Sequence, residues 1–126
     1  FQGCPAYGGP DEELIRIYQD AKDYPALARV TTWLVERYPN YARAYASRAW
    51  AHQNMKKNDE AFRDYERAAQ LGFGAAFEYL AYMTEWGRGT KQDYRKAIDL
   101  YMIAHSKGVK GAKEKADKIR AGLGIR

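Results

Sequence analysis

Two stretches decide the fold: residues 58–72, which read NDEAFRDYERAAQLG, and residues 93–108, which read DYRKAIDLYMIAHSKG. Each has an acidic residue near its start, ends in glycine, and spaces two alanines around a tyrosine so that all three fall on one helical face. These residues are Ala61, Tyr65 and Ala68 in the first stretch, and Ala97, Tyr101 and Ala104 in the second. Ala61 and Ala97 are 36 residues apart, and self-similarity at such a period is typical of helical repeat arrays. We predict two helices that bury these faces.

Apolar periodicity and Pro and Gly signals predict five further helices, at 10–21, 25–38, 41–55, 75–86 and 112–121. No run alternates with the period of a strand, and the short turns favour antiparallel packing of consecutive helices. The predicted fold class is therefore all-α. On the first helix, the apolar stripe is predicted to comprise Leu14, Ile17, Tyr18 and Ala21. Asn58 or Asp59 is expected to cap the helix of the first stretch, and Asp93 that of the second.

Composition is compatible with one packed domain, which we assign to residues 10–126. The chain has 126 residues, of which 46% are hydrophobic and 14% aromatic, enough to bury a core. Residues 1–9 are expected to form a flexible arm, and Phe1, Gln2 and Gly3 resemble the remnant of a cleaved tag. Cys4 allows two interpretations: a free thiol, or the lipid-bearing cysteine of a bacterial lipoprotein. The second would place the protein at a membrane, in the bacterial periplasm or cell envelope.

Two segments resemble known helical repeats. Segment 42–72 has Tyr45 and Ala49 in its first helix and the Ala-Tyr-Ala face in its second, and it resembles a tetratricopeptide repeat. Segment 80–108 carries the turn GRGTKQD at 87–93 before its Ala-Tyr-Ala face, and it resembles the related Sel-one-like repeat. The turn glycines permit a positive φ where the chain reverses. Thr84 and Thr90 replace an aromatic residue and a valine of that pattern, which should loosen the turn.

The resemblance implies a right-handed α-solenoid of about three antiparallel helix pairs, with the basic last helix as a C-terminal cap. It also implies that the first helix of each pair lines a concave surface that binds a protein or a peptide. Some small bacterial members of this repeat family are immunity proteins that neutralise secreted toxins in the envelope. We therefore expect a protein-binding adaptor, and such a toxin-neutralising role is its narrower form.

No constellation for catalysis stands out, so we expect no enzyme activity, metal or cofactor. His52 and His105 lack a partner at ligand spacing, and His52 is expected to be packed in the core. Ser47 and Ser106 have no evident base. The segment 87–89 lacks the Lys-Ser/Thr pair of a phosphate-binding loop.

The expected binding residues lie on the outward faces of the first helices. They are Arg16, Arg43, Trp50, Gln53, Glu78, Tyr82 and Glu85. Large aromatic residues on an outward helical face are anchor candidates for a partner. An alternative is that Trp50 only packs against Tyr82 of the adjacent helix pair. Trp86 is expected to pack under the glycine turn.

A second function class follows from the charge distribution. Residues 105–126 hold seven Lys or Arg and two Asp or Glu, which equals the whole net charge of +5. The alternative function is therefore electrostatic binding of an acidic partner, a membrane surface or nucleic acid through this basic segment. Without aromatic residues in 107–126 for stacking, nucleic acid is the weaker choice. No small-molecule substrate is expected. Exposed apolar ends of a short array would favour a homodimer.

Overall fold

The computed structural model describes residues 10–124, which form seven helices and no strand. The arm 1–9 with Cys4, and residues 125–126, lie outside the described residues. The helices are α1 (Pro10–Ala21), α2 (Tyr24–Arg37), α3 (Ala42–Asn54), α4 (Asn58–Gln70), α5 (Gly74–Trp86), α6 (Tyr94–Ser106) and α7 (Ala112–Leu123). The all-α class and the seven predicted helices are confirmed, with ends that shift by up to a few residues.

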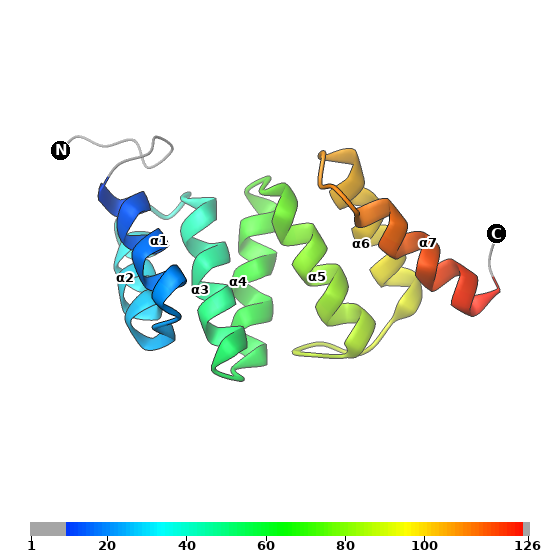
Figure 1. Cartoon of the computed structure of the whole chain (residues 1–126), viewed down its shortest axis with the longest axis horizontal. Helices are drawn as coiled ribbons and strands as arrows, with labels where there is room; N and C mark the ends of the chain where they lie inside the picture. Colours follow the sequence, from blue (N-terminus) through cyan, green and yellow to red (C-terminus); the bar gives the residue numbers. More distant parts are fainter. Residues whose placement is uncertain (1–9, 125–126) are drawn as a thin grey trace.

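The helices follow one another in a row along the long axis of the molecule, from α1 at one end to α7 at the other (Figure 1). Each helix packs against the next one in the chain as an antiparallel neighbour, and α1 also contacts α3. Because consecutive helices are joined by short turns, this order is what the sequence predicts.

The Ala-Tyr-Ala faces form the centre of the core, as predicted. All six residues of the two faces are buried. Tyr65 lies in a cluster with Ala46 and Ala49 of α3, whereas Tyr101 lies in a second cluster with Ala112 and Ala116 of α7. Small residues let neighbouring helices approach closely, and each tyrosine ring fills the space that the alanines leave. The sequence repeat therefore serves packing.

The predicted apolar stripe of α1 is wrong by one position. Leu14 is 40% exposed and Ile17 is 51% exposed, whereas Ile15 is fully buried. Adjacent positions on a helix point about 100° apart, so the core meets a narrower face of α1 than its apolar pattern suggests. The physical reason is the small number of neighbours, because α1 packs mainly on α2 and more weakly on α3.

The glycine turn between α5 and α6 follows the prediction closely. Gly87 and Gly89 have φ values of 69° and 73°, and the Asp93 carboxylate accepts a hydrogen bond from the Lys96 backbone N–H at 3.1 Å. The predicted cap of α4 is wrong, because the cap position is Lys57 and makes no side-chain bond. Asn58 is already helical, and its backbone lies directly against Gly89. The turn between α5 and α6 thus packs on the first residue of α4, in the preceding helix pair.

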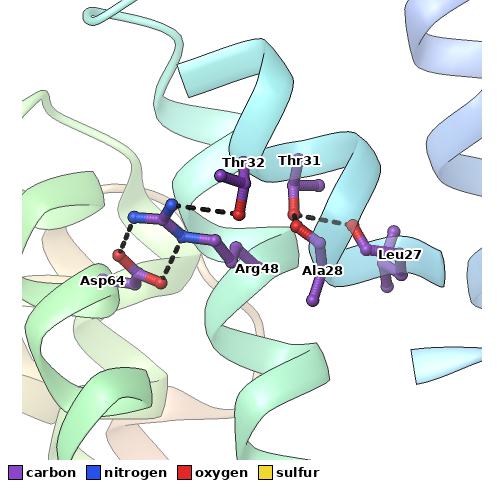
Figure 2. Close-up of polar contacts among 6 residues, drawn as sticks. All are labelled: Leu27, Ala28, Thr31, Thr32, Arg48 and Asp64. Atoms are coloured by element: carbon purple, nitrogen blue, oxygen red, sulfur yellow. Dashed lines mark hydrogen bonds and ion pairs between the residues drawn. The ribbon is translucent and has the colours of Figure 1, made fainter. Parts of the chain in front are cut away.

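One ion pair ties the N-terminal helices together. The Arg48 guanidinium on α3 donates through Nε and Nη2 to the Asp64 carboxylate on α4, both at 2.8 Å. Its Nη1 donates to the Thr32 hydroxyl on α2 at 3.3 Å (Figure 2). The hydrogen bonds to Asp64 raise the pKa of Arg48 above its ordinary value, so the guanidinium remains charged. Three helices therefore share one polar contact.

His52 on α3 is partly buried, in general agreement with the expected packed histidine. Its Nδ1 is buried and has no hydrogen-bond partner among the described residues. Desolvation lowers the pKa of His52 below its ordinary value, because a charged imidazole would lose hydration there without a compensating bond.

Stability should consequently decrease in mild acid. As the pH falls below about 6.5, the unfolded chain takes up a proton at His52 before the folded chain does, so protonation favours unfolding. We expect the free energy of unfolding to decrease from pH 7 to pH 5, and His52→Gln to flatten that decrease. Urea unfolding at a series of pH values measures both slopes. Equal slopes for the two proteins would show that His52 does not titrate differently on folding.

Candidate partner-binding groove

A groove of about 410 Å³ runs between the outward faces of α3 and α5, and we call it the α3–α5 groove. Its lining residues are Trp50, Gln53, Asn54, Glu78, Tyr79, Tyr82, Arg88 and Lys115. Four of the seven residues predicted for binding are thus brought together: Trp50, Gln53, Glu78 and Tyr82. They meet because outward positions on α3 and α5 share one side of the row of helices.

The other three predicted residues lie elsewhere. Arg43 lines a smaller hollow of about 140 Å³ beside the groove, and it forms an ion pair with Glu12 of α1 at 3.3 Å. Glu85 lines a different hollow at the α7 end. Arg16 is exposed on α1 and lines none of these three concavities. The structure therefore does not gather Arg16 with the rest.

Trp50 is partly fixed by a contact with the preceding helix pair. Its ring packs edge-to-face on Tyr24 of α2, with centroids 5.2 Å apart and an interplanar angle of 69°. The ring partner of Trp50 is thus Tyr24, whereas the alternative predicted from the sequence was Tyr82. Trp50 still lines the α3–α5 groove, so one ring joins the core of the first helices to the outer surface. Such an anchored ring can receive a partner at little entropic cost.

The two tyrosines of α5 differ in how they are held. Tyr82 is 36% exposed, and the Arg88 guanidinium lies 5.6 Å from its ring centroid. Tyr79 is 37% exposed and stacks on Tyr65 at 4.7 Å with an angle of 9° between the rings. Tyr79 is not among the predicted binding residues, although it follows Glu78 on the outward side of α5.

The polar residues of the predicted site already bind within the protein. Gln53 Oε1 accepts a hydrogen bond from the Tyr65 hydroxyl at 3.0 Å, and Glu85 Oε1 accepts one from the Tyr101 hydroxyl at 3.1 Å. Burial is the main cause that raises the pKa of both tyrosines, so both hydroxyls stay protonated and donate. These two side chains therefore hold the core tyrosines in place.

The basic C-terminal segment is partly neutralised by the protein itself. Lys115 of α7 pairs with Glu78 of α5 at 2.6 Å, which joins the last helix to the α3–α5 groove. Lys113 and Arg120 both pair with Asp117, at 2.9 Å and 3.1 Å. The hydrogen bond from Lys113 is the main cause that lowers the pKa of Asp117. The sequence pattern showed the excess of cations but not these partners.

Trp86 departs from its predicted position. It is 57% exposed and contributes to the wall of the hollow at the α7 end, together with Tyr94 and Leu123. The glycine turn is instead held by Gln92, whose side-chain amide donates to the Glu85 carbonyl at 3.2 Å. The expected packing of Trp86 under the turn is therefore wrong.

Two comparisons with known proteins identify no relative of this chain. No protein-family model matches the chain, and a search of curated proteins gives no significant match. In residues 10–124, no cluster of three or more His, Cys, Asp or Glu side chains has the arrangement of a metal site. None of the helices in that range has the length and apolar character that crossing a bilayer requires.

Proposed function

We propose that this chain is a non-catalytic protein-interaction module that binds a protein or peptide segment in the α3–α5 groove. In this proposal the seven helices are a short right-handed solenoid of tetratricopeptide-like and Sel-one-like repeats, with α7 as its cap. The observation that carries the proposal is the meeting of three aromatic side chains in the lining of one groove: the half-buried Trp50 and the exposed Tyr79 and Tyr82. A bacterial envelope adaptor that neutralises a toxin is its narrower form.

The division between core and surface supports this proposal. The Ala-Tyr-Ala faces are buried, so α4 and α6 serve as packing helices, whereas α3 and α5 present aromatic rings outward. Tyrosine and tryptophan dominate the binding energy of many interfaces because they bury large areas and lose little entropy. Gln53 and Glu78, two of the polar groups around them, already bind within the protein, so these two should contribute less.

The test begins by identifying the partner. A photo-crosslinking amino acid at Asn54, an exposed residue of the groove, should capture the partner in the native host for identification by mass spectrometry. The double variant Trp50→Ala/Tyr82→Ala should then weaken the purified complex by at least about 30-fold, the loss typical of a single hot spot. Isothermal titration calorimetry measures the dissociation constants.

Trp33→Ala is the matched control, because Trp33 of α2 is 51% exposed and lies outside the groove. It should bind like the wild type. Circular dichroism must show that the double variant remains folded, since Trp50 also packs on Tyr24. Undiminished binding by a folded double variant would reject the groove.

The rival function, electrostatic binding through the basic C-terminal segment, differs in its response to salt. Aromatic binding in the groove should tolerate a change from 50 to 300 mM salt with only a modest loss of affinity. Binding to a polyanion should weaken by roughly 10³-fold or more over a comparable range. The internal pairs of Lys113, Lys115 and Arg120 favour the groove, because those cations already have carboxylate partners.

A further inference from the structure

A second concavity, of about 540 Å³, lies between α5, the start of α6 and α7, and we call it the α5–α7 hollow. Its walls include Trp86, Tyr94, Ile119 and Leu123. Three of these are large apolar side chains left exposed: Trp86 by 57%, Leu123 by 42% and Tyr94 by 38%. They come from three helices that meet only after folding, and contiguous exposed apolar surface of this kind marks an interaction site.

The hollow adjoins the α3–α5 groove, because Tyr82 and Lys115 line both. A segment that binds in the groove can therefore extend into the hollow without leaving the surface. The volume suits one bulky side chain and its neighbours, since ligand pockets of this size are ordinary in proteins.

The charged side chains around the hollow and the adjoining groove carry a small positive excess. The Glu85 carboxylate accepts a hydrogen bond from the neutral Tyr101 hydroxyl and keeps its charge, whereas Glu78 forms an ion pair with Lys115. Lys118 lines the hollow and forms no ion pair with any residue in 10–124. Arg88, in the adjoining groove, contacts the Tyr82 ring and has no carboxylate partner in the same range. Together, the residues that line the hollow and the adjoining groove carry three cations, Arg88, Lys115 and Lys118, and two carboxylates, Glu78 and Glu85, which leaves one positive charge in excess.

We propose that the α5–α7 hollow takes a large aromatic or aliphatic side chain of the partner, from a peptide segment whose neighbouring residues are acidic. This inference rests on the proposed function and specifies the chemistry of the partner. The apolar side chain would bury against Trp86, Tyr94 and Leu123, where aromatic rings add specific edge and stacking contacts. The adjacent carboxylates would pair with Lys118 and reach Arg88, and a basic segment would be repelled.

The probe is a phage-displayed library of random twelve-residue peptides, selected on the full chain at 100 mM salt. Selected peptides should combine Trp, Phe or Leu with Asp or Glu within about three residues, beyond the frequency in the unselected library. A synthetic copy of a selected peptide then serves for titration, with intrinsic tryptophan fluorescence and calorimetry as readouts. Selection of apolar peptides without acidic neighbours, or with basic ones, would overturn the inference.

Two charge reversals separate the hollow from the basic segment as a whole. Lys118→Glu should lower the affinity for the synthetic peptide by roughly five- to tenfold. Lys110→Glu makes the same change of net charge on an exposed residue that does not line the hollow, and it should have little effect. An equal loss in both variants would mean that the peptide responds to general charge, which contradicts the inference.

Leu123→Ala and Trp50→Ala separate this inference from the proposed function, since each residue lines only one of the two concavities. Both variants should weaken the binding of the partner that is captured at Asn54. A loss with Trp50→Ala alone would leave the groove standing and reject the hollow. Undiminished binding in both would reject the groove as well. Sedimentation velocity tests whether a second copy of the chain occupies the hollow. Self-association that Leu123→Ala abolishes would assign the hollow to that second copy and would overturn the inference of a peptide ligand.

Discussion

Replacing Arg48 by methionine should lower the free energy of unfolding by about 3 kcal/mol, the low end of the range for breaking a buried ion pair. Asp64 is the reason. Only 7% of the Asp64 residue is exposed, and both of its carboxylate oxygens accept hydrogen bonds from Arg48. Methionine fills much of the arginine volume but offers no donor, so the carboxylate would remain buried and charged without a partner.

The loss should extend beyond the pair itself. Arg48 also donates to Thr32 (Figure 2), so its removal breaks the polar contact between α2 and α3 as well as that between α3 and α4. Because each helix packs mainly on its neighbours, the effect should concentrate at the N-terminal end. Amide hydrogen exchange should therefore rise in α2 to α4 before it rises in α6 and α7.

Urea unfolding followed by circular dichroism measures the change in free energy. The double replacement Arg48→Met/Asp64→Leu should recover most of the loss, because it removes the buried charge together with its partner. Lys113→Met is the matched control, since its pair with Asp117 is solvent-exposed, and it should leave stability nearly unchanged. If Arg48→Met were as harmless as Lys113→Met, the pair would have no structural importance.

The fold was predictable because its determinants lie within single helices and single turns. The Ala-Tyr-Ala spacing identifies the buried face of α4 and α6, and the two glycines with Asp93 identify the turn before α6. Each of these signals depends on a local rule of geometry. Arg48 and Asp64 are different, because they are 16 residues apart and only the packing of α3 on α4 makes them partners.

The candidate site was predictable in part, for a related reason. A helical pattern places Trp50 and Tyr82 off the core face, and both do line the α3–α5 groove. The pattern does not indicate which neighbouring helix covers which side of a given helix. Leu14 and Ile17 are apolar but meet no helix that buries them. Trp86, Tyr94 and Leu123 meet around one hollow because α7 folds back beside α5, which no local spacing indicates.

Gly89→Ala should lower the free energy of unfolding by roughly 3 kcal/mol, from two costs that add. Gly89 has φ of +73°, where a side chain costs about 1–2 kcal/mol. A Cβ there would also overlap the carbonyl oxygen of Asn58 and lie 2.9 Å from its carbonyl carbon. Neither atom belongs to a flexible side chain, so the turn or the start of α4 must move, at a further cost of about 1–3 kcal/mol.

Gly72→Ala separates the two costs of Gly89→Ala. Gly72 has φ of +91°, and a Cβ added to it would meet no atom within 4 Å, so this variant should lose only the conformational part, about 1–2 kcal/mol.

Hydrogen exchange gives the location: Gly89→Ala should speed exchange in the first turn of α4 as well as in the turn 87–93, although 29 residues separate Asn58 from Gly87. Equal losses for the two alanine variants, with α4 unchanged, would mean that the contact between the turn and α4 contributes nothing. A larger loss for Gly89→Ala, with faster exchange in the first turn of α4, would instead show that the contact between this turn and Asn58 stabilises the packing of one helix pair on the next.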